Sequence, residues 1–291
     1  MENVNLWNQL LIWPIVNVLI AFYKLFEWLH IPGPLGFAII LLTIVFRLVL
    51  YPLTKVQLSS AKKMQNLKPH LDLLNAKHKD DKTALQQAQL ALYKEHGVNP
   101  AAGCLPMLVQ LPILIALYNV FYEVLNNGNL EKLVATLNKV VYHSALQLST
   151  FDFTFFGINL GIKPNEYQKY GWWLLAIPVI TGLLQWYQSK LMLPQGATNT
   201  TNPTNTTNTT NVKTKKENAK SIELVKVEDG KDGKGKEPAV DQSMEMQKQM
   251  AMITPIMFGY FALQFPLGLA LYWNIFGLFG IVQQLKVNKE N

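Results

Sequence analysis

One side chain stands out for chemistry. Of the 26 basic residues in the sequence, 25 are lysines and one, Arg47, is an arginine inside an apolar run. A guanidinium group stays protonated in proteins. At the centre of a transmembrane helix its charge costs between ~2.5 and more than 10 kcal/mol unless it meets water or a partner. On a straight helix, Arg47 would lie roughly 12 Å before Lys55. An ionisable residue in such a place indicates a binding function.

Further polar residues lie in the same and in other apolar runs. Thr43 precedes Arg47 by one helical turn, so both occupy one helix face. The others are Gln110, Thr181, Gln185, Gln188 and Asn274. Each of them alone is explained by a hydrogen bond between packed helices, worth about 1 kcal/mol.

Two environments are open for Arg47. It is tied to carbonyls or to an acid of a neighbouring helix, or it faces a hydrophilic cavity. The apolar runs hold no Asp or Glu in their interior, and Glu123 lies at the end of its run. This favours the cavity. Because Arg47, Gln185 and Gln188 lie near the same ends of their runs, we expect a groove that opens to the cytoplasm.

Most catalytic and cofactor chemistry is excluded. The single Cys104 rules out an internal disulfide framework and a cysteine-cluster metal site. The five histidines lie outside the apolar runs, and the sequence has no HExxH pair, Walker loop, GxGxxG or GxSxG motif. We therefore predict no enzyme activity, no catalytic residues, no metal and no cofactor. The net charge of +7 comes from lysines between apolar runs, so it indicates membrane orientation rather than direct nucleic-acid binding.

Composition indicates a membrane protein crossed by several helices. The chain is 49% hydrophobic and 15% charged, against about 25% charged in soluble domains. A span needs about 20 mostly apolar residues. The 36 residues from Met250 to Leu285 carry no charge and contain Phe265-Pro266-Leu267-Gly268, which predicts a tight hairpin of two spans. Five spans result.

The first residues are ambiguous. Polar residues and Pro14 interrupt Leu6–Tyr23, and three tryptophans flank or enter it. We predict a helix lying in the headgroup plane, with a sixth span as the alternative. A cleaved signal peptide is not expected, because a basic start and a small-residue cleavage site are missing.

Lysine placement sets the orientation. With residues 1–34 outside, 20 lysines are inside and 5 outside, which predicts a cytoplasmic carboxyl terminus. Met64, Leu67, Leu71 and Leu74 follow helical spacing, and a second helix is expected from Asp80-Asp81 to His96, ending at Gly97. These two helices predict a cytoplasmic hairpin. The Asn/Thr-rich and charged sequence that follows the third span is expected to stay disordered.

The predicted organisation follows the chain in order. It comprises an interfacial helix (1–34), span one (35–54), a cytoplasmic helical hairpin (55–99), span two (104–125), an external loop (126–170), span three (171–190), a disordered cytoplasmic linker (191–249), span four (250–265), span five (267–285) and a tail (286–291).

Three segments resemble the YidC family of membrane protein insertases. They are Thr43-Ile44-Val45-Phe46-Arg47 followed by Tyr51-Pro52-Leu53-Thr54; Asn99-Pro100-Ala101-Ala102-Gly103-Cys104-Leu105-Pro106 followed by Gln110-Leu111-Pro112; and Phe265-Pro266-Leu267-Gly268-Leu269-Ala270-Leu271-Tyr272-Trp273. They occur in family order and spacing across about residues 7–285.

The resemblance implies a five-helix core around a groove open to cytoplasm and lipid. It assigns the groove arginine to Arg47, places Thr43 beside it, and matches Tyr272 and Trp273 to aromatic positions that contact a substrate helix. Gln185 is the candidate polar residue of the third span, with Gln188 a close alternative. Residues 55–96 match the family's cytoplasmic hairpin, and 7–30 its outer-surface helix.

The chain departs from some relatives. We expect no large external domain, no extra first span and no amino-terminal lipid-attachment cysteine, and the sequence shows only Lys286 to Asn291 where some relatives carry a basic extension that binds ribosomes. Direct ribosome tethering by the tail is therefore not expected.

These observations predict an insertase of the bacterial inner membrane. Arg47 would draw an acidic external segment of a nascent membrane protein into the groove, with the bilayer as a partner and the Sec translocon and the ribosome or signal recognition pathway as further candidates. The alternative is a small anion transporter or channel that uses Arg47 as its binding charge. An intramembrane enzyme is remote, because the spans contain no catalytic pair.

Overall fold

The computed structural model describes residues 5–79, 81–98, 105–127, 130–192 and 242–290. This described part of the chain has the all-α character predicted for a helical membrane protein, apart from one short β-hairpin. Its elements are η1 (Asn8–Ile12), α1 (Trp13–Trp28), α2 (Pro34–Val49), α3 (Tyr51–Asn66), α4 (Lys68–Lys77), α5 (Lys82–Glu95), α6 (Leu105–Asn127), α7 (Leu130–Val140), η3 (Ser144–Leu146), β1 (Thr154–Phe155), β2 (Ile158–Asn159), η4 (Pro164–Glu166), α8 (Tyr167–Tyr170), η5 (Trp172–Leu175), α9 (Ala176–Met192), α10 (Gln242–Gln264) and α11 (Leu267–Glu290). The Asn99–Gly103 motif and most of the predicted linker, 193–241, lie outside the described residues.

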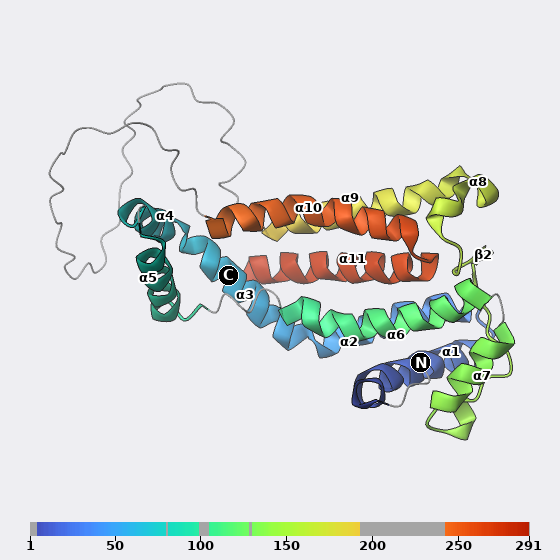
Figure 1. The fold of residues 1–291 in the computed structure, drawn as a ribbon. Coiled ribbons are helices and arrows are strands. Elements are labelled where there is room, and N and C mark those ends of the chain that lie inside the picture. Colours follow the sequence, from blue (N-terminus) through green and yellow to red (C-terminus); the bar gives the residue numbers. More distant parts are fainter. Residues whose placement is uncertain (1–4, 80, 99–104, 128–129, 193–241, 291) are drawn as a thin grey trace, which may run out of the picture.

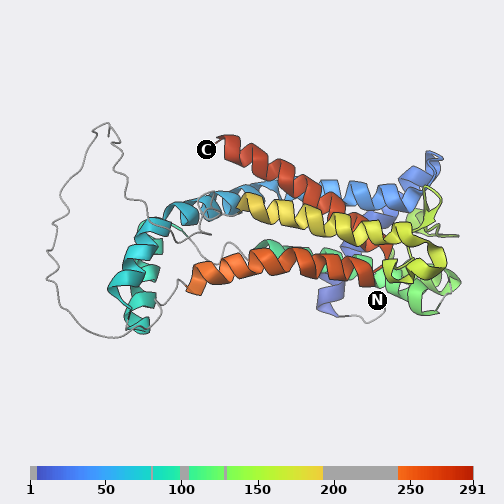
Figure 2. The same ribbon diagram turned by 90° about the horizontal axis from the view of Figure 1, so that it is seen from above.

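Five helices, α2, α6, α9, α10 and α11, lie side by side along one axis (Figures 1 and 2). Helices α4 and α5 lie beyond one end of this bundle, and α7, α8 and the β-hairpin lie at the other (Figure 1). The carboxyl-terminal end of α11 is at the α4–α5 end. Each of the five bundle helices contains most of one predicted span.

Length and composition single out fewer spans. Among the described residues, Asn8–Trp28 and Leu267–Val287 are long and apolar enough to cross a membrane, and a third span results if Pro34–Val49 and Tyr51–Met64 count as one bent span. Shorter apolar helices are Gln110–Tyr122 and Met252–Gln264. The number of five spans stays a prediction. The amino-terminal segment also keeps both possibilities, because it passes this test and packs against α2 and α6.

The span predicted over 35–54 is bent in the structure. Helix α2 ends at Val49, and the axis turns by 63° before α3 continues from Tyr51. Pro52 explains the bend, because its ring has no N–H and clashes with the carbonyl one turn earlier. A second break follows at Leu67, where Pro69 stands in the first turn of α4. The predicted first helix of the hairpin is therefore two helices.

The last two helices are longer than expected. Helix α10 begins at Gln242, inside the predicted linker, and α11 continues to Glu290, inside the predicted tail. The added residues are mostly Gln, Met, Lys and Glu, which favour helix. Hydropathy marks where an apolar run ends, and these polar residues let the helices extend beyond it.

Helix α5 starts at the residue that its capping chemistry indicates. The Asp81 carboxylate accepts from the backbone N–H of Thr83 at 3.0 Å and of Ala84 at 2.9 Å, which satisfies two free donors of the first turn. The helix stops before Gly97, whose φ is +60°. Gln89 donates to Asn75 at 3.1 Å and joins α5 to α4.

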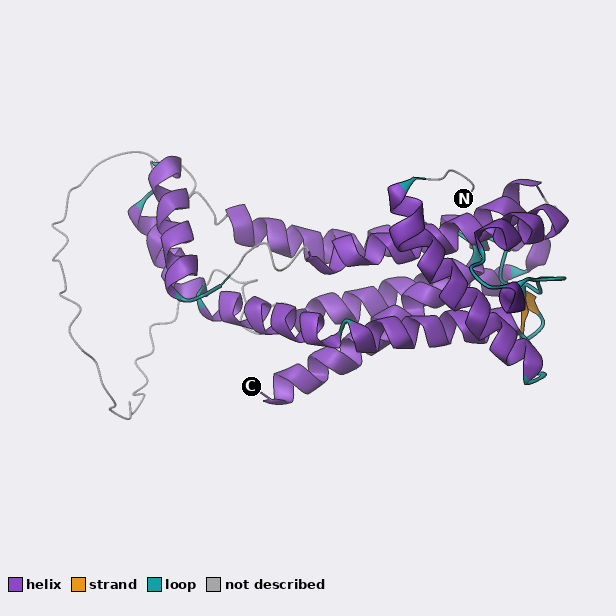
Figure 3. Cartoon of the chain, turned by 90° about the horizontal axis from the view of Figure 1, so that it is seen from below, coloured by secondary structure: helices purple, strands orange, loops and turns teal. Residues whose placement is uncertain are grey.

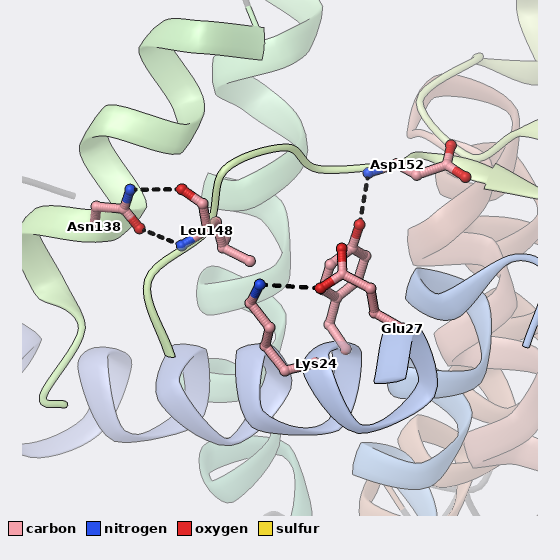
Figure 4. A network of polar contacts seen from close by, with 6 residues as sticks. Lys24, Glu27, Asn138, Leu148 and Asp152 are labelled. Carbon is pink, nitrogen blue, oxygen red and sulfur yellow. Dashed lines mark hydrogen bonds and ion pairs between the residues drawn. The ribbon is translucent and has the colours of Figure 1, made fainter. Parts of the chain in front are cut away.

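The opposite end of the bundle carries the loops and the two short strands (Figure 3). Polar side chains hydrogen-bond these loops to the helices. The Asn17 amide donates to the carbonyls of Trp13 at 2.8 Å and Val140 at 2.9 Å, and its oxygen accepts from the Tyr142 N–H at 2.8 Å. Figure 4 shows the Asn138 amide hydrogen-bonded at both its atoms to the Leu148 backbone, which holds the loop after α7 to that helix. The Tyr23 hydroxyl accepts from the Asp152 N–H at 2.9 Å. The bonds of Asn17 and Tyr23 join the 130–162 segment to α1.

The same segment caps α11. The N–H groups of Leu267 and Gly268 donate to the carbonyls of Ile162 and Leu160, each at 2.9 Å. A Cβ on Gly268 would collide with the Phe121 ring, and one on Gly36 would collide with Phe155. The loops, α2, α6 and α11 are therefore closely packed at this end.

We expect Asn17→Ala to lower stability by about 2 kcal/mol or more, because it leaves the buried Val140 carbonyl and Tyr142 N–H without partners. The midpoint of thermal unfolding in detergent measures this loss. Asn165→Ala is the control, since it removes one exposed bond, to Gln264 at 3.1 Å, and should change the midpoint little. Equal midpoints for the two variants would contradict a stabilising role for the Asn17 hydrogen bonds.

Candidate functional site

Arg47 lies in the last turn of α2 and contacts α11. Its Nη2 donates to the Phe276 carbonyl at 2.5 Å, and its Nη1 donates to Gln283 Oε1 at 3.1 Å. The guanidinium carbon is 3.4 Å from the centroid of the Phe276 ring. Phe276 therefore holds the charge through both its carbonyl and the face of its ring.

Gln283 contacts Arg47 at two points. Besides accepting from Nη1, its amide nitrogen donates to the Arg47 backbone carbonyl at 3.3 Å. That carbonyl belongs to the final turn of α2, whose carbonyls have no partners within the helix. Arg47 is 6% exposed and Gln283 is 7% exposed, so both polar groups are removed from solvent together.

The expectation of a water-facing arginine stays a prediction. The contacts of Arg47 in this structure are a tie to a carbonyl, with an amide beside it. The estimate of depth on a straight helix fails, because α2 ends at Val49 and places Arg47 near a helix end. A cation there is favoured by the helix dipole. The groove that opens to the cytoplasm stays a prediction.

Two polar atoms of this region are buried without a hydrogen-bond partner among the described residues. They are Arg47 Nε and Asn274 Oδ1. An unpaired buried polar group costs about 1–3 kcal/mol. The guanidinium is thus held through its two Nη atoms, and its Nε–H is left for a ligand or a water molecule.

Thr43 lies one turn before Arg47, as predicted, and is buried. Its hydroxyl donates to the Ile39 carbonyl of its own helix at 2.6 Å. Thr181 does the same toward Ile177 at 2.9 Å. Both hydroxyls are satisfied locally, which is common for threonine inside helices.

Helix α9 brings Gln188 to the arginine. A Cβ added to Gly280 of α11 would lie 2.6 Å from Gln188 Nε2 and 2.8 Å from Arg47 Nη2. Gln188 and Arg47 thus meet over the bare backbone of Gly280, so the structure places Gln188 beside Arg47. Gln185, the first candidate from the resemblance, lies three residues earlier on α9 and is half-buried.

Tyr272 and Gln110 extend the cluster to α6. The Gln110 amide donates to the Tyr272 hydroxyl. The Tyr272 ring lies 5.9 Å from that of Phe276, on which Arg47 stacks. A continuous chain of contacts therefore joins the predicted site residues of α2, α6 and α11.

Trp273 points into a different cluster. Its ring lies 5.6 Å from Phe258 and 6.4 Å from Phe261 of α10, and 5.7 Å from Phe265, the residue after that helix. Tyr272 and Trp273 are both buried. Contact with a substrate helix, which the resemblance implies, stays a prediction and requires this packing to open.

Sequence reasoning missed Phe276, Gly280 and Gln283. Gln283 carried a usable signal, because Gln283-Gln284 is a polar pair in an apolar run and lies near the same membrane face as Arg47. Gly280 carried a weaker signal as a small residue in a span. Phe276 carried none, since one more aromatic residue in an apolar run does not stand out in the sequence. No group of three His, Cys, Asp or Glu able to hold a metal occurs within the described part of the chain.

Comparison with known proteins gives one consistent result. Residues 25–291 match a family model described as 60Kd inner membrane protein. The chain is 30% identical over 266 residues to the membrane protein insertase YidC of Shewanella halifaxensis, covering 91% of this chain and 35% of that protein. It is 27% identical over 271 residues to that of Rickettsia conorii, covering 93% and 38%.

A shorter match is stronger. The chain is 48% identical over 107 residues to the membrane protein insertase YidC of Caulobacter vibrioides, covering 37% of this chain and 16% of that protein. The chain thus spans little more than a third of the length of the first two relatives.

We expect Gly280→Ala to displace the Arg47 guanidinium while leaving stability nearly unchanged, because the atoms that its Cβ would meet are the ends of flexible side chains. Since the protein has one arginine, selective ¹⁵N-arginine labelling gives the spectrum of Arg47 alone and measures the displacement. Gly277→Ala is the control, because the nearest atom to its Cβ would be Gln188 Oε1, at 3.8 Å. Identical spectra for both variants and the wild type would contradict this geometry.

Proposed function

Because the chain belongs to the family of 60Kd inner membrane proteins, we propose that it is an insertase that helps nascent membrane proteins enter and fold in the bilayer. The observation that carries the proposal is a permanent charge, Arg47, held between helices by neutral groups. A buried cation with no acidic partner in these contacts is suited to attract a passing anion.

The proposed substrate segment is acidic and lies outside the membrane after insertion. Its carboxylate would replace a neutral partner of the guanidinium, and a bidentate arginine–carboxylate pair is stronger than either bond it replaces. A polar segment paired in this way escapes part of the desolvation penalty of the hydrocarbon core.

The apolar part of the substrate would move along α9 and α10 toward lipid. Both helices expose large apolar side chains: Val179, Ile180, Leu183 and Trp186 of α9, and Met252, Ile253, Ile256 and Tyr260 of α10. A hydrophobic helix leaving the site meets the same apolar surroundings there as in the bilayer. The proposed mechanism uses no nucleotide and no catalytic group, so we propose a function other than that of an enzyme.

We propose that the five bundle helices cross the bacterial inner membrane with α4, α5 and the carboxyl terminus in the cytoplasm. The lysine distribution supports this orientation, as does the position of α4, α5 and the end of α11 at one end of the bundle (Figure 1). Proposed partners are nascent membrane proteins with acidic external segments, the lipid bilayer, and the Sec translocon and ribosome at the cytoplasmic face.

We expect Arg47→Ala to impair the insertion of substrates with acidic external segments into proteoliposomes, and Arg47→Lys to restore part of it. Lysine keeps the charge but not the planar fork. Protease protection of the translocated segment measures insertion.

Lys190→Ala is the matched control, because it removes an exposed cation at the end of α9 and should leave insertion unchanged. A neutral-tailed substrate should depend less on Arg47. Full insertion of acidic substrates by Arg47→Ala would overturn the arginine mechanism.

A further inference from the structure

We propose that Gln283 is a specificity-determining residue that occupies Arg47 as a neutral internal competitor, so that only an anionic segment displaces it. The inference rests on the proposed insertase function and adds a residue and a selection rule to it. It follows from the two-point contact between Gln283 and Arg47 and from the burial of both residues.

The geometry makes Gln283 a stand-in for a carboxylate. Its Oε1 lies 3.1 Å from Arg47 Nη1, where an oxygen of an acidic substrate would bind. Its Nε2 donates to the Arg47 carbonyl at 3.3 Å, which fixes the orientation of the amide. A carboxylate would have no donor for that carbonyl. The site as built therefore fits an amide.

Bond strength then sets the selection. A hydrogen bond from a guanidinium to a carboxylate is roughly twice as strong as one between neutral groups. Arg47 to Gln283 has one charged partner, so a neutral substrate group offers no advantage over the bond already present. A carboxylate adds the second charge and gains by the exchange. Neutral polar segments are thereby rejected without any steric barrier.

The remaining contacts of Arg47 can persist during the exchange. The Phe276 carbonyl and ring hold Nη2 and the face of the guanidinium, while Nη1 is the donor that Gln283 occupies. Nε is buried and has no partner among the described residues. Nη1 and Nη2 each carry an N–H at the end of the guanidinium, and these two form a fork that a carboxylate accepts, whereas Nε lies on the Nη2 edge, away from Nη1.

The adjacent residue supplies a matched control. Gln284 is also 7% exposed, but its amide donates to the Leu191 carbonyl of α9 at 3.1 Å. The two glutamines share residue type, helix and burial, and they differ in whether they touch Arg47. Effects of placing a carboxylate in this part of α11 are therefore separable from effects on the arginine.

The first test compares Gln283→Glu with Gln284→Glu in the proteoliposome assay. Glu at 283 supplies a permanent internal counter-ion, so insertion of an acidic-tailed substrate should fall by about tenfold, equivalent to about 1.4 kcal/mol. Gln284→Glu should insert that substrate at the wild-type rate. Equal losses in the two variants, or no loss in Gln283→Glu, would overturn the proposal.

The second variant is Gln283→Leu, which removes the competitor. It should raise the insertion of a neutral-tailed substrate more than that of the acidic-tailed one. The ratio of acidic-tailed to neutral-tailed insertion should therefore fall. An unchanged ratio would overturn the selection rule. A wild-type protein that inserts neither substrate would instead contradict the proposed function, which separates the two failures.

A third test detects anion binding at Arg47 directly, without an insertion assay, because the protein has a single arginine. In ¹⁵N-arginine-labelled wild-type protein, we expect separate Nη signals from a guanidinium that cannot rotate freely. A short peptide rich in aspartate should shift them, and the same sequence with asparagine should not. In Gln283→Glu neither peptide should shift them. Equal responses to the two peptides in wild-type protein would overturn the proposal, even where a variant fails to accumulate.

Discussion

The permanent charge of Arg47 is the constraint around which the contacts between α2, α9 and α11 are arranged. A guanidinium buried between apolar helices must be surrounded by acceptors. The chain supplies a backbone carbonyl, an amide oxygen and an aromatic face, all from α11. Gly280 lets these groups approach, because any side chain there would meet both Arg47 and Gln188. Contacts from three helices thus meet at one charge.

The two ends of the bundle are held by different kinds of contact. At the end that carries α7, α8 and the strands, rings fill the space against glycines, and loop carbonyls take the first N–H groups of α11. At the other end the contacts are polar, and α2 gives way to α3 through a bend of 63°. A closed end and a polar end give the bundle a direction, which suits a protein that receives substrate from one side.

The sequence was sufficient for what depends on local pattern. Apolar runs located the five bundle helices, and Asp81 with Gly97 located α5. The sequence did not indicate which residues contact one another across helices. Nothing in the spacing of Arg47 tells that its acceptors are Phe276 and Gln283, more than two hundred residues later. Pro52 was present in the sequence, but the span over 35–54 was predicted from hydropathy alone, which does not register the bend at a proline. Thr43, Gln110 and Gln188 were found because polar groups in spans are few, and Tyr272 was found through the family resemblance.

The same logic explains why the site combines an arginine with a glutamine. A lysine is a point charge and could not stack on a ring while bonding a carbonyl and an amide in fixed directions. A glutamate opposite the arginine would satisfy it permanently and leave no charge to offer. A leucine would leave an unpaired charge, whose burial would weaken the fold. Glutamine holds the guanidinium in place and still leaves its charge uncompensated. In the proposed mechanism, that intermediate strength keeps a buried cation both tolerable to the fold and available to an anion.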